Sequence, residues 1–78
     1  MIVTLIGKPG CHLCDDAREV IHAVIGEFSG IELVERSILD DAALRDEYAE
    51  EIPVVLIDGA RHTYWRVDAE RLRAALRA

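Results

Sequence analysis

The sequence predicts a small α/β protein whose elements follow the order β-α-β-α-β-β-α. Short β-rich apolar runs alternate with segments whose apolar residues recur every three or four positions, which is typical of strands followed by amphipathic helices. The chain has 78 residues, so there is room for one domain and one modest core. Both cysteines fall where the first strand gives way to the first helix. We therefore expect residues 1–78 to form a single domain.

The first two elements are a buried strand and an amphipathic helix. Residues 2–6 are nearly all apolar, which fits a strand buried on both faces, and residues 7–10 interrupt it with two glycines and a proline. From Leu13 the apolar spacing predicts a helix that ends near Gly26 or at residues 29–30. Acidic side chains in the early turns suit the positive end of the helix dipole.

The middle of the chain contains a second strand and a short helix. Residues 31–38 form the predicted strand, and Asp40 or Asp41 is expected to cap the helix. Proline disfavours helical geometry in the residue ahead of it, so the chain before Pro53 is expected to be extended. The helix must therefore end by about Glu50.

The last part of the chain is predicted to be a hairpin followed by a helix. Residues 54–57 form a third buried strand, and Asp58-Gly59 is a signal for a tight turn. Residues 61–65 are more polar and fit an edge strand. A final helix is expected to start at Asp68.

Charge and composition exclude several classes of function. The net charge of -6 disfavours nucleic acid and anionic membrane surfaces as partners, because both favour clustered Lys and Arg. The hydrophobic content of 51% excludes disorder as the main state. The first residues lack the pattern of a secretory signal, and no run reaches membrane-spanning length. We expect a cytoplasmic protein.

The stretch Lys8-Pro9-Gly10-Cys11-His12-Leu13-Cys14 contains both cysteines of the chain. A C-x-x-C beside a β-α-β pattern in a protein that is not secreted indicates thiol-disulfide chemistry, and one helical turn brings the two sulfurs within bridging distance. A disulfide that closes so short a loop removes little entropy from the unfolded chain. The spacing therefore suits chemistry better than stability.

The position of each cysteine suggests its role. Cys11 is placed at the start of a helix, where backbone N-H groups and the helix dipole favour the thiolate, so it is the predicted nucleophile. Cys14 lies one turn further in and is the predicted resolving residue. Lys8 and His12 are predicted to stabilise the Cys11 thiolate by adding positive charge near it.

The alternative is a binding module in which the C-x-x-C holds a metal or an iron-sulfur cluster. A zinc site would need two of His12, His22 and His62, whose spacing does not match a closed site. Small metallochaperones also place a C-x-x-C after the first strand, but their order is β-α-β-β-α-β. The helix predicted after Asp41 argues against them. We expect no bound metal and no bound cofactor.

The element order, the Lys-Pro-x-Cys-x-x-Cys and the Ile52-Pro53 that opens the third strand together resemble a glutaredoxin, the smallest form of the thioredoxin fold. The resemblance covers essentially the whole chain, and residues 40–48 and 52–55 are similar to a short bacterial glutaredoxin-like branch. It implies a four-stranded mixed sheet in the order 2-1-3-4 flanked by three helices. It also implies that Ile52-Pro53 is a cis peptide that faces the cysteines. A cis turn would leave the backbone groups of Ile52 free to position an extended substrate.

The resemblance implies a dithiol thiol-disulfide oxidoreductase. Its substrates would be disulfides of proteins or small molecules, with glutathione or a thioredoxin-type reductase as the electron donor, and we expect a monomer. The chain departs from well-studied glutaredoxins at His12-Leu13, where they usually carry Pro-Tyr. It also has Trp65-Arg66-Val67-Asp68 where they carry the Gly-Gly and acidic residue that receive glutathione. Glutathione therefore stays open as a co-substrate.

Overall fold

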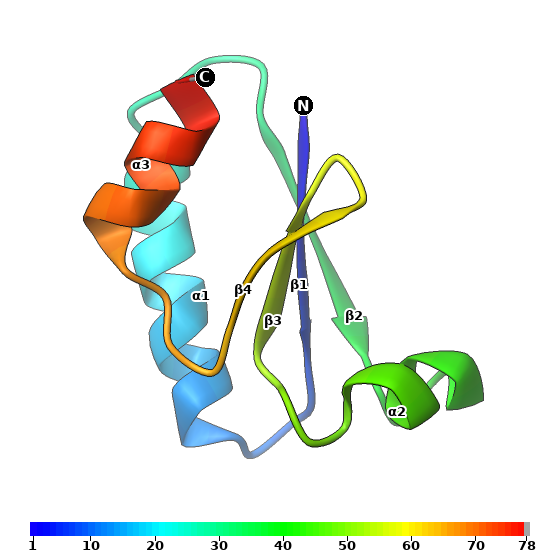
Figure 1. The fold of residues 1–78 in the computed structure, drawn as a ribbon. Helices are drawn as coiled ribbons and strands as arrows, with labels where there is room; N and C mark the ends of the chain where they lie inside the picture. Colours follow the sequence, from blue (N-terminus) through cyan, green and yellow to red (C-terminus); the bar gives the residue numbers. More distant parts are fainter. Residues whose placement is uncertain (78) are drawn as a thin grey trace.

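The structure, a computed structural model, describes residues 1–77, and its elements follow the predicted order (Figure 1). The four strands form one mixed sheet in the order β2-β1-β3-β4. Strand β1 runs parallel to β2 and antiparallel to β3, and β3 runs antiparallel to β4. The elements are β1 (Ile2–Gly7), α1 (His12–Ile25), β2 (Glu32–Ser37), α2 (Ala42–Tyr48), β3 (Val54–Ile57), β4 (Ala60–Tyr64) and α3 (Ala69–Arg77).

The two central strands divide their side chains between two cores. In the β1–β3 register, Leu5 pairs with Val55 and Ile6 pairs with Val54. Successive side chains of a strand point to opposite faces, so these two pairs lie on opposite sides of the sheet. All four are buried, as expected for strands covered on both faces.

Helices α1 and α3 cover one face of the sheet and enclose the larger core (Figure 1). Apolar residues spaced three or four apart on α1 share this core with two leucines of α3, which lie four residues apart on one helical face. The buried members of this core are Val3, Leu5, Ala17, Ile21, Val24, Val55, Leu72 and Leu76.

Helix α2 packs on the opposite face over a smaller core. Ile6, Ile38 and Val54 are buried there, and Leu44 and Tyr48 of α2 contact them while remaining partly exposed. No residue of α2 is fully buried. The two faces of the sheet are therefore covered unequally.

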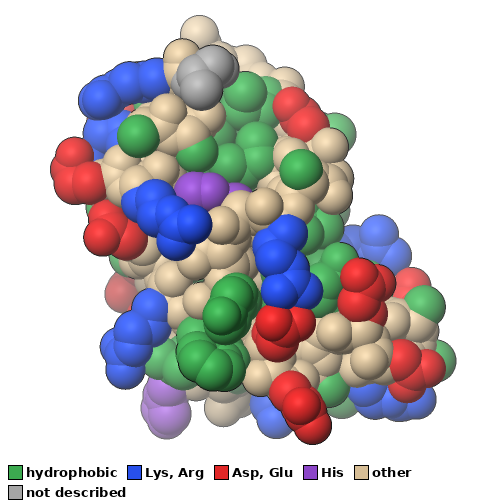
Figure 2. Space-filling model, in the orientation of Figure 1, with side chains coloured by type: hydrophobic (Ala, Val, Ile, Leu, Met, Phe, Trp, Pro, Cys, Tyr) green, Lys and Arg blue, Asp and Glu red, His purple; other side chains and the backbone are tan. Residues whose placement is uncertain are grey.

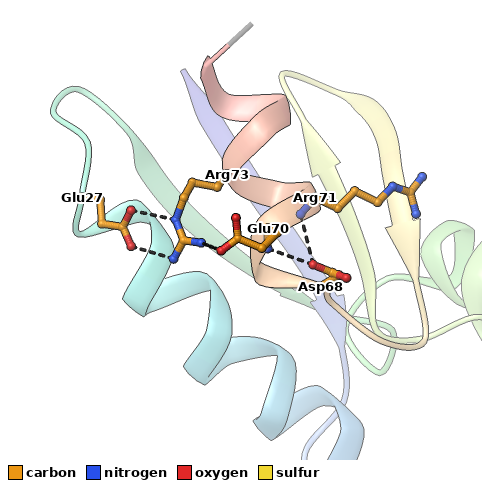
Figure 3. Close-up of polar contacts among 5 residues, drawn as sticks. All are labelled: Glu27, Asp68, Glu70, Arg71 and Arg73. Carbon is orange, nitrogen blue, oxygen red and sulfur yellow. Dashed lines mark hydrogen bonds and ion pairs between the residues drawn. The ribbon is translucent and has the colours of Figure 1, made fainter.

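Aspartates cap α2 and α3 at their first turns. Oδ1 of Asp41 accepts hydrogen bonds from two backbone N-H groups of α2, at 2.9 and 3.3 Å. Of the two residues predicted as the cap, Asp41 is therefore the N-cap of α2. Oδ1 of Asp68 accepts from the N-H groups of Glu70 and Arg71, at 2.8 and 3.1 Å (Figure 3). Asp68 is thus the residue before the helix and not its first member.

The hairpin between β3 and β4 has the predicted two-residue turn. Asp58 and Gly59 both have positive φ, 48° and 85°, which is the requirement of a turn that matches strand twist. Strand β4 starts at Ala60 and ends at Tyr64, one residue earlier at each end than predicted. It stops there because Trp65 adopts a φ of 64°, which is outside the β region.

The two ends of the described chain lie together at the top of the view in Figure 1, away from the connection between β1 and α1. Among residues 1–77, no helix has the length and hydrophobicity required to cross a membrane.

Candidate functional site

Three connecting segments meet at the lower end of the molecule in Figure 1. They are the connection from β1 to α1, the segment that leads into β3, and the turn that leaves β4. The first contains Cys11 and leads directly into the first turn of α1, which contains Cys14. The second contains Pro53, and the third contains Trp65. Residues far apart in the sequence therefore contribute to one end of the fold, and loops on a rigid scaffold are a common place for function.

Cys11 is the N-cap of α1, with extended backbone angles of -97° and 114°. Its Sγ accepts a hydrogen bond from the backbone N-H of Cys14 at 3.2 Å, and its carbonyl accepts from the N-H of Asp15 at 3.0 Å. The side chain is half-buried, so the sulfur is both accessible and directed at the positive end of the helix dipole. Negative charge on this sulfur is stabilised by that geometry.

Cys14 is buried and lies one helical turn beyond Cys11. Burial, together with the hydrogen bond to Cys11, raises the pKa of the Cys14 thiol to about 11, although a backbone hydrogen bond from Lys8 works in the opposite direction. Both cysteines are free thiols in the structure. The two sulfurs of the motif are therefore chemically unequal.

Lys8 and His12 lie on either side of Cys11 in the sequence, and both are exposed. Among residues 1–77, no hydrogen bond or ion pair joins either side chain to another residue. Lys8 lines a hollow beside Cys14, whereas His12 is the first residue of α1. Both side chains are therefore free to approach a molecule bound at Cys11.

Pro53 is buried at the start of β3, and the Ile52–Pro53 peptide bond is cis. The carbonyl of Pro53 accepts a hydrogen bond from the N-H of Trp65 at 2.8 Å. Arg61 of β4 binds the Glu51 carboxylate through two hydrogen bonds of 2.8 Å, which anchors the segment before Pro53. Within the described part of the chain, the amide and carbonyl of Ile52 form no hydrogen bond.

A model of the family described as Glutaredoxin-like domain (DUF836) matches residues 2–77. This chain belongs to that family. Uncharacterized proteins of Mycobacterium tuberculosis and Mycobacterium bovis are 34% identical to it over 76 residues, which cover 92% of this chain and 78% of theirs. Membership agrees with the resemblance in the sequence to glutaredoxins.

Solved structures agree on the fold of this glutaredoxin-like chain. The X-ray structure of a structural-genomics target protein from X. campestris is 37% identical, with a TM-score of 0.79 over 96% of this chain and 95% of that one. Thioredoxin 1 of Thermosipho africanus gives a TM-score of 0.65 at 12% identity, over 99% and 96% of the two chains. The expected thioredoxin-like fold, with its four-stranded mixed sheet and three helices, is confirmed.

The glutaredoxin-like chain also has a hollow of about 370 Å³ between β1, β2 and the start of α1, which sequence reasoning missed. Cys14 forms part of its wall. Arg18, one turn beyond Cys14, binds both Asp15 and Glu35, at 2.9 and 2.7 Å, and also lines the hollow. The sequence pointed to this hollow only in that Arg18 follows Cys14 by four residues, which places both on one face of α1.

The three histidines are distributed over two elements, with His12 and His22 on α1 and His62 on β4. Among residues 1–77, no three His, Cys, Asp or Glu side chains are grouped so that they could hold a metal ion. His22 lies in the last part of α1 and is exposed. His62 lies on β4, where Nε2 is buried with no partner among the described residues, and burial and the charge of Arg71 lower its pKa.

Proposed function

We propose that this glutaredoxin-like protein is a dithiol thiol-disulfide oxidoreductase in which Cys11 attacks and Cys14 resolves. The observation that carries the proposal is the inequality of the two thiols. The sulfur of Cys11 is accessible and accepts a backbone N-H at a helix N-terminus, while that of Cys14 is buried one turn away. An attacking thiol needs access and a stabilised thiolate, and a resolving thiol needs proximity alone.

The reaction has two exchange steps. In the first, the Cys11 thiolate attacks a substrate disulfide, forms a mixed disulfide and releases one substrate sulfur as a thiolate, which takes up a proton. In the second, Cys14 loses its proton and attacks Cys11 Sγ, and the other substrate thiolate leaves. The substrate disulfide gains two electrons and the protein disulfide is formed. Two glutathione molecules or a thioredoxin-type reductase would then restore the dithiol.

The surroundings of Cys14 support this order of events. A pKa of about 11 keeps its thiol protonated near neutral pH, so it does not compete with Cys11 for the incoming disulfide. Its backbone N-H already contacts Cys11 Sγ at 3.2 Å, so the two side chains are adjacent before any reaction. Lys8 and His12 are proposed to stabilise the Cys11 thiolate and the anionic leaving group.

Ile52 and Pro53 are proposed to position the substrate. The free amide and carbonyl of Ile52 can pair with an extended segment, as a strand added to a sheet edge does. The carbonyl of Pro53 accepts a hydrogen bond from the N-H of Trp65, at 2.8 Å, so the segment is fixed before the substrate arrives. A prearranged segment lowers the entropy that binding must offset.

The test compares two single variants in disulfide exchange. Cys11→Ser is expected to abolish the reduction of a disulfide substrate, because the attacking sulfur is absent. Cys14→Ser is expected to accumulate a mixed disulfide through Cys11, detectable by mass spectrometry as the mass of the protein plus one substrate half. The Cys11→Ser/Cys14→Ser double variant serves as the control for non-covalent binding. Equal residual exchange by the two single variants would contradict the proposal.

A second measurement tests the inequality of the thiols without a substrate. In Cys11→Ser, alkylation of Cys14 by iodoacetamide is expected to be slow near pH 7 and to accelerate at alkaline pH, because burial, the largest cause of the raised pKa of Cys14, remains in this variant. The unfolded protein in urea provides the reference rate for an exposed cysteine. A Cys14 that reacts in the folded state as rapidly as in urea would show that it is not the protected thiol of the pair.

A further inference from the structure

Trp65 occupies a backbone conformation that suits glycine. Its φ of 64° places it in the left-handed region, where bulky L-residues are uncommon. Its side chain is nevertheless 53% exposed at the end of the molecule that carries the cysteines. A large apolar side chain that is both exposed and in an unfavourable backbone conformation is a reason to look for a function.

Three hydrogen bonds hold Trp65 in this position. Its N-H is shared between the carbonyls of Pro53, at 2.8 Å, and Glu51, at 3.3 Å. The indole Nε1-H donates to the carbonyl of Glu50 at 3.0 Å. All three acceptors belong to the segment that leads into β3, so the indole is fixed beside the free backbone groups of Ile52.

Two further apolar side chains extend this surface. The ring of Tyr64 meets that of Trp65 edge to face, with the centroids 5.0 Å apart, and Tyr64 is 43% exposed. Leu13, which lies between the two cysteines, shares with Trp65 a hollow of about 170 Å³. Figure 2 shows hydrophobic side chains gathered on this face over the turn that leaves β4. We call Leu13, Tyr64 and Trp65 the aromatic surface.

The size and charge of the hollow indicate what it receives. Small-molecule pockets typically measure roughly 300–1,000 Å³, so a volume near 170 Å³ suits a single side chain better than a whole small ligand. Asp16 and Arg66 give the hollow one charge of each sign, while Leu13, Val20 and Val67 provide an apolar lining. The hollow therefore complements a neutral, apolar side chain.

We propose that the aromatic surface docks an extended segment of a protein substrate, with an apolar side chain near the reacting half-cystine placed in the hollow beside Trp65. The backbone of that segment pairs with Ile52, and Tyr and Trp rings are the side chains that protein-protein contacts most often use as anchors. This inference rests on the proposed function and assigns its substrate class: disulfides within polypeptides, in preference to small free disulfides.

The first test measures the preference among disulfide substrates. The substrates are two disulfide peptides that differ only in Leu or Ser next to the half-cystine, and the small disulfide of 2-mercaptoethanol. Trp65→Gly is the variant, because glycine tolerates the same φ and only the indole is lost. The variant is expected to lower kcat/KM for the Leu peptide, relative to kcat/KM for the small disulfide, by about tenfold. Most of this change is expected to be a higher KM for the peptide.

The matched control is Leu39→Ala, which removes another exposed apolar side chain, 62% exposed, from the turn after β2 and outside the hollow. It is expected to leave the ratio as in the wild type. An equal loss for all three substrates in Trp65→Gly, or an unchanged ratio, would overturn the assignment of the aromatic surface.

The second test separates docking from chemistry. Trp65 is the single tryptophan of the chain, so its fluorescence reports directly on the surface. In the Cys11→Ser/Cys14→Ser variant, which cannot exchange disulfides, the Leu peptide is expected to give a saturable change in fluorescence and the Ser peptide a weaker one. No change with either peptide would overturn the inference. Failure of the proposed function would show instead as absent exchange in the wild type while the fluorescence change persists.

Discussion

Gly7, the last residue of β1, determines how closely the strand approaches the buried thiol. A Cβ atom built on Gly7 would lie 2.8 Å from Cys14 Sγ and 3.2 Å from Cys14 Cβ. The first distance is shorter than any ordinary van der Waals contact, and both atoms belong to a buried side chain with little freedom to move. Glycine at this position is therefore required for β1 to pack against Cys14.

Gly7→Ala is expected to destabilise the reduced protein by about 1–3 kcal/mol, the usual range for overpacking a close-packed interior. Urea unfolding followed by circular dichroism measures the change. The same substitution in a Cys14→Ala background is expected to cost less, because the sulfur nearest to the new methyl group is gone. An equal cost in both backgrounds would mean that the contact with Sγ is not the cause.

The residues of the site differ in how far the sequence alone could place them. Cys11 at the helix start and Cys14 one turn inside follow from local spacing, because three residues of helix determine that geometry. The contact of Gly7 with Cys14 and the left-handed backbone of Trp65 depend on how separate segments meet. The sequence pattern placed Trp65 at the end of the edge strand, and the resemblance placed it where glutaredoxins carry glycine; neither predicted its left-handed backbone or its exposure.

At the scale of elements, an arginine joins α3 to the turn that follows α1. Nε and Nη2 of Arg73 each donate to the Glu27 carboxylate at 2.8 Å, and Nη1 contacts Glu70 on the same helix (Figure 3). This two-point contact bridges 46 positions in the sequence. The hydrogen bond from Arg73 lowers the pKa of the Glu27 carboxyl.

The Glu27 contact makes part of the stability depend on pH. A carboxyl whose pKa is lower in the folded state than in the unfolded state contributes stability above its ordinary value of 4.5. That contribution disappears as the pH falls through the folded-state pKa. The difference in melting temperature between wild type and Arg73→Gln is therefore expected to be largest near neutral pH and to shrink below pH 4.5.

Arg71→Gln is the matched control, because it removes the same charge from the same helix. Among residues 1–77, the guanidinium of Arg71 donates a hydrogen bond only to the carbonyl of His62, at 3.5 Å, and pairs with no carboxylate. Its effect on the melting temperature is expected to show no such decline between pH 5 and pH 3. A parallel decline in both variants would point to the overall charge of the protein rather than to Glu27.

The boundaries of the elements show where local signals were sufficient. Residues 54–57 were predicted to form a strand, and β3 has the same limits because its apolar run is bounded by proline and by Asp58-Gly59. Strand β4 is displaced by one residue, since the conformation of Trp65 depends on hydrogen bonds to a distant segment. The limits of a strand can therefore be predicted from the sequence where neighbouring proline or turn residues end it, and not where distant hydrogen bonds do.

For the whole molecule, the unequal cover of the sheet predicts unequal stability. Helix α2 has seven residues, none of them fully buried, whereas α3 has nine and buries Leu72 and Leu76. Apolar burial is the main source of helix stability in proteins, so α2 is expected to open locally without global unfolding. Native-state hydrogen exchange is expected to show protection factors at least about tenfold lower for α2 amides than for α3 amides.

Comparing the α2 and α3 amides within one spectrum keeps solvent and temperature the same. The amides of β1 and β3 give the protection factor that corresponds to global unfolding. The amides of Arg45 and Ala49 are suitable probes, because each donates to a carbonyl four residues earlier at 3.1 Å. If they exchange as slowly as the amides of β1, then α2 is part of the same cooperative unit as the sheet.

The global arrangement could be predicted from the order of the elements and from the resemblance to glutaredoxins. A parallel β1–β2 pair requires a crossover helix, and a two-residue turn requires β3 and β4 to be antiparallel neighbours. The hollow beside Cys14 could not be predicted, because it depends on the space that α1 leaves over β2. Voids of that kind follow from packing and leave no mark on the sequence.

The position of the two chain ends has a practical consequence. Met1 directly precedes β1 and Arg77 is the last residue of α3, and both lie at the end of the molecule opposite the cysteines (Figure 1). A fusion partner, a fluorophore or a solid support attached at either end would therefore leave the thiols facing away from the attachment. The protein can be immobilised on a resin or an electrode surface by either terminus with the end that carries the two cysteines directed into solution.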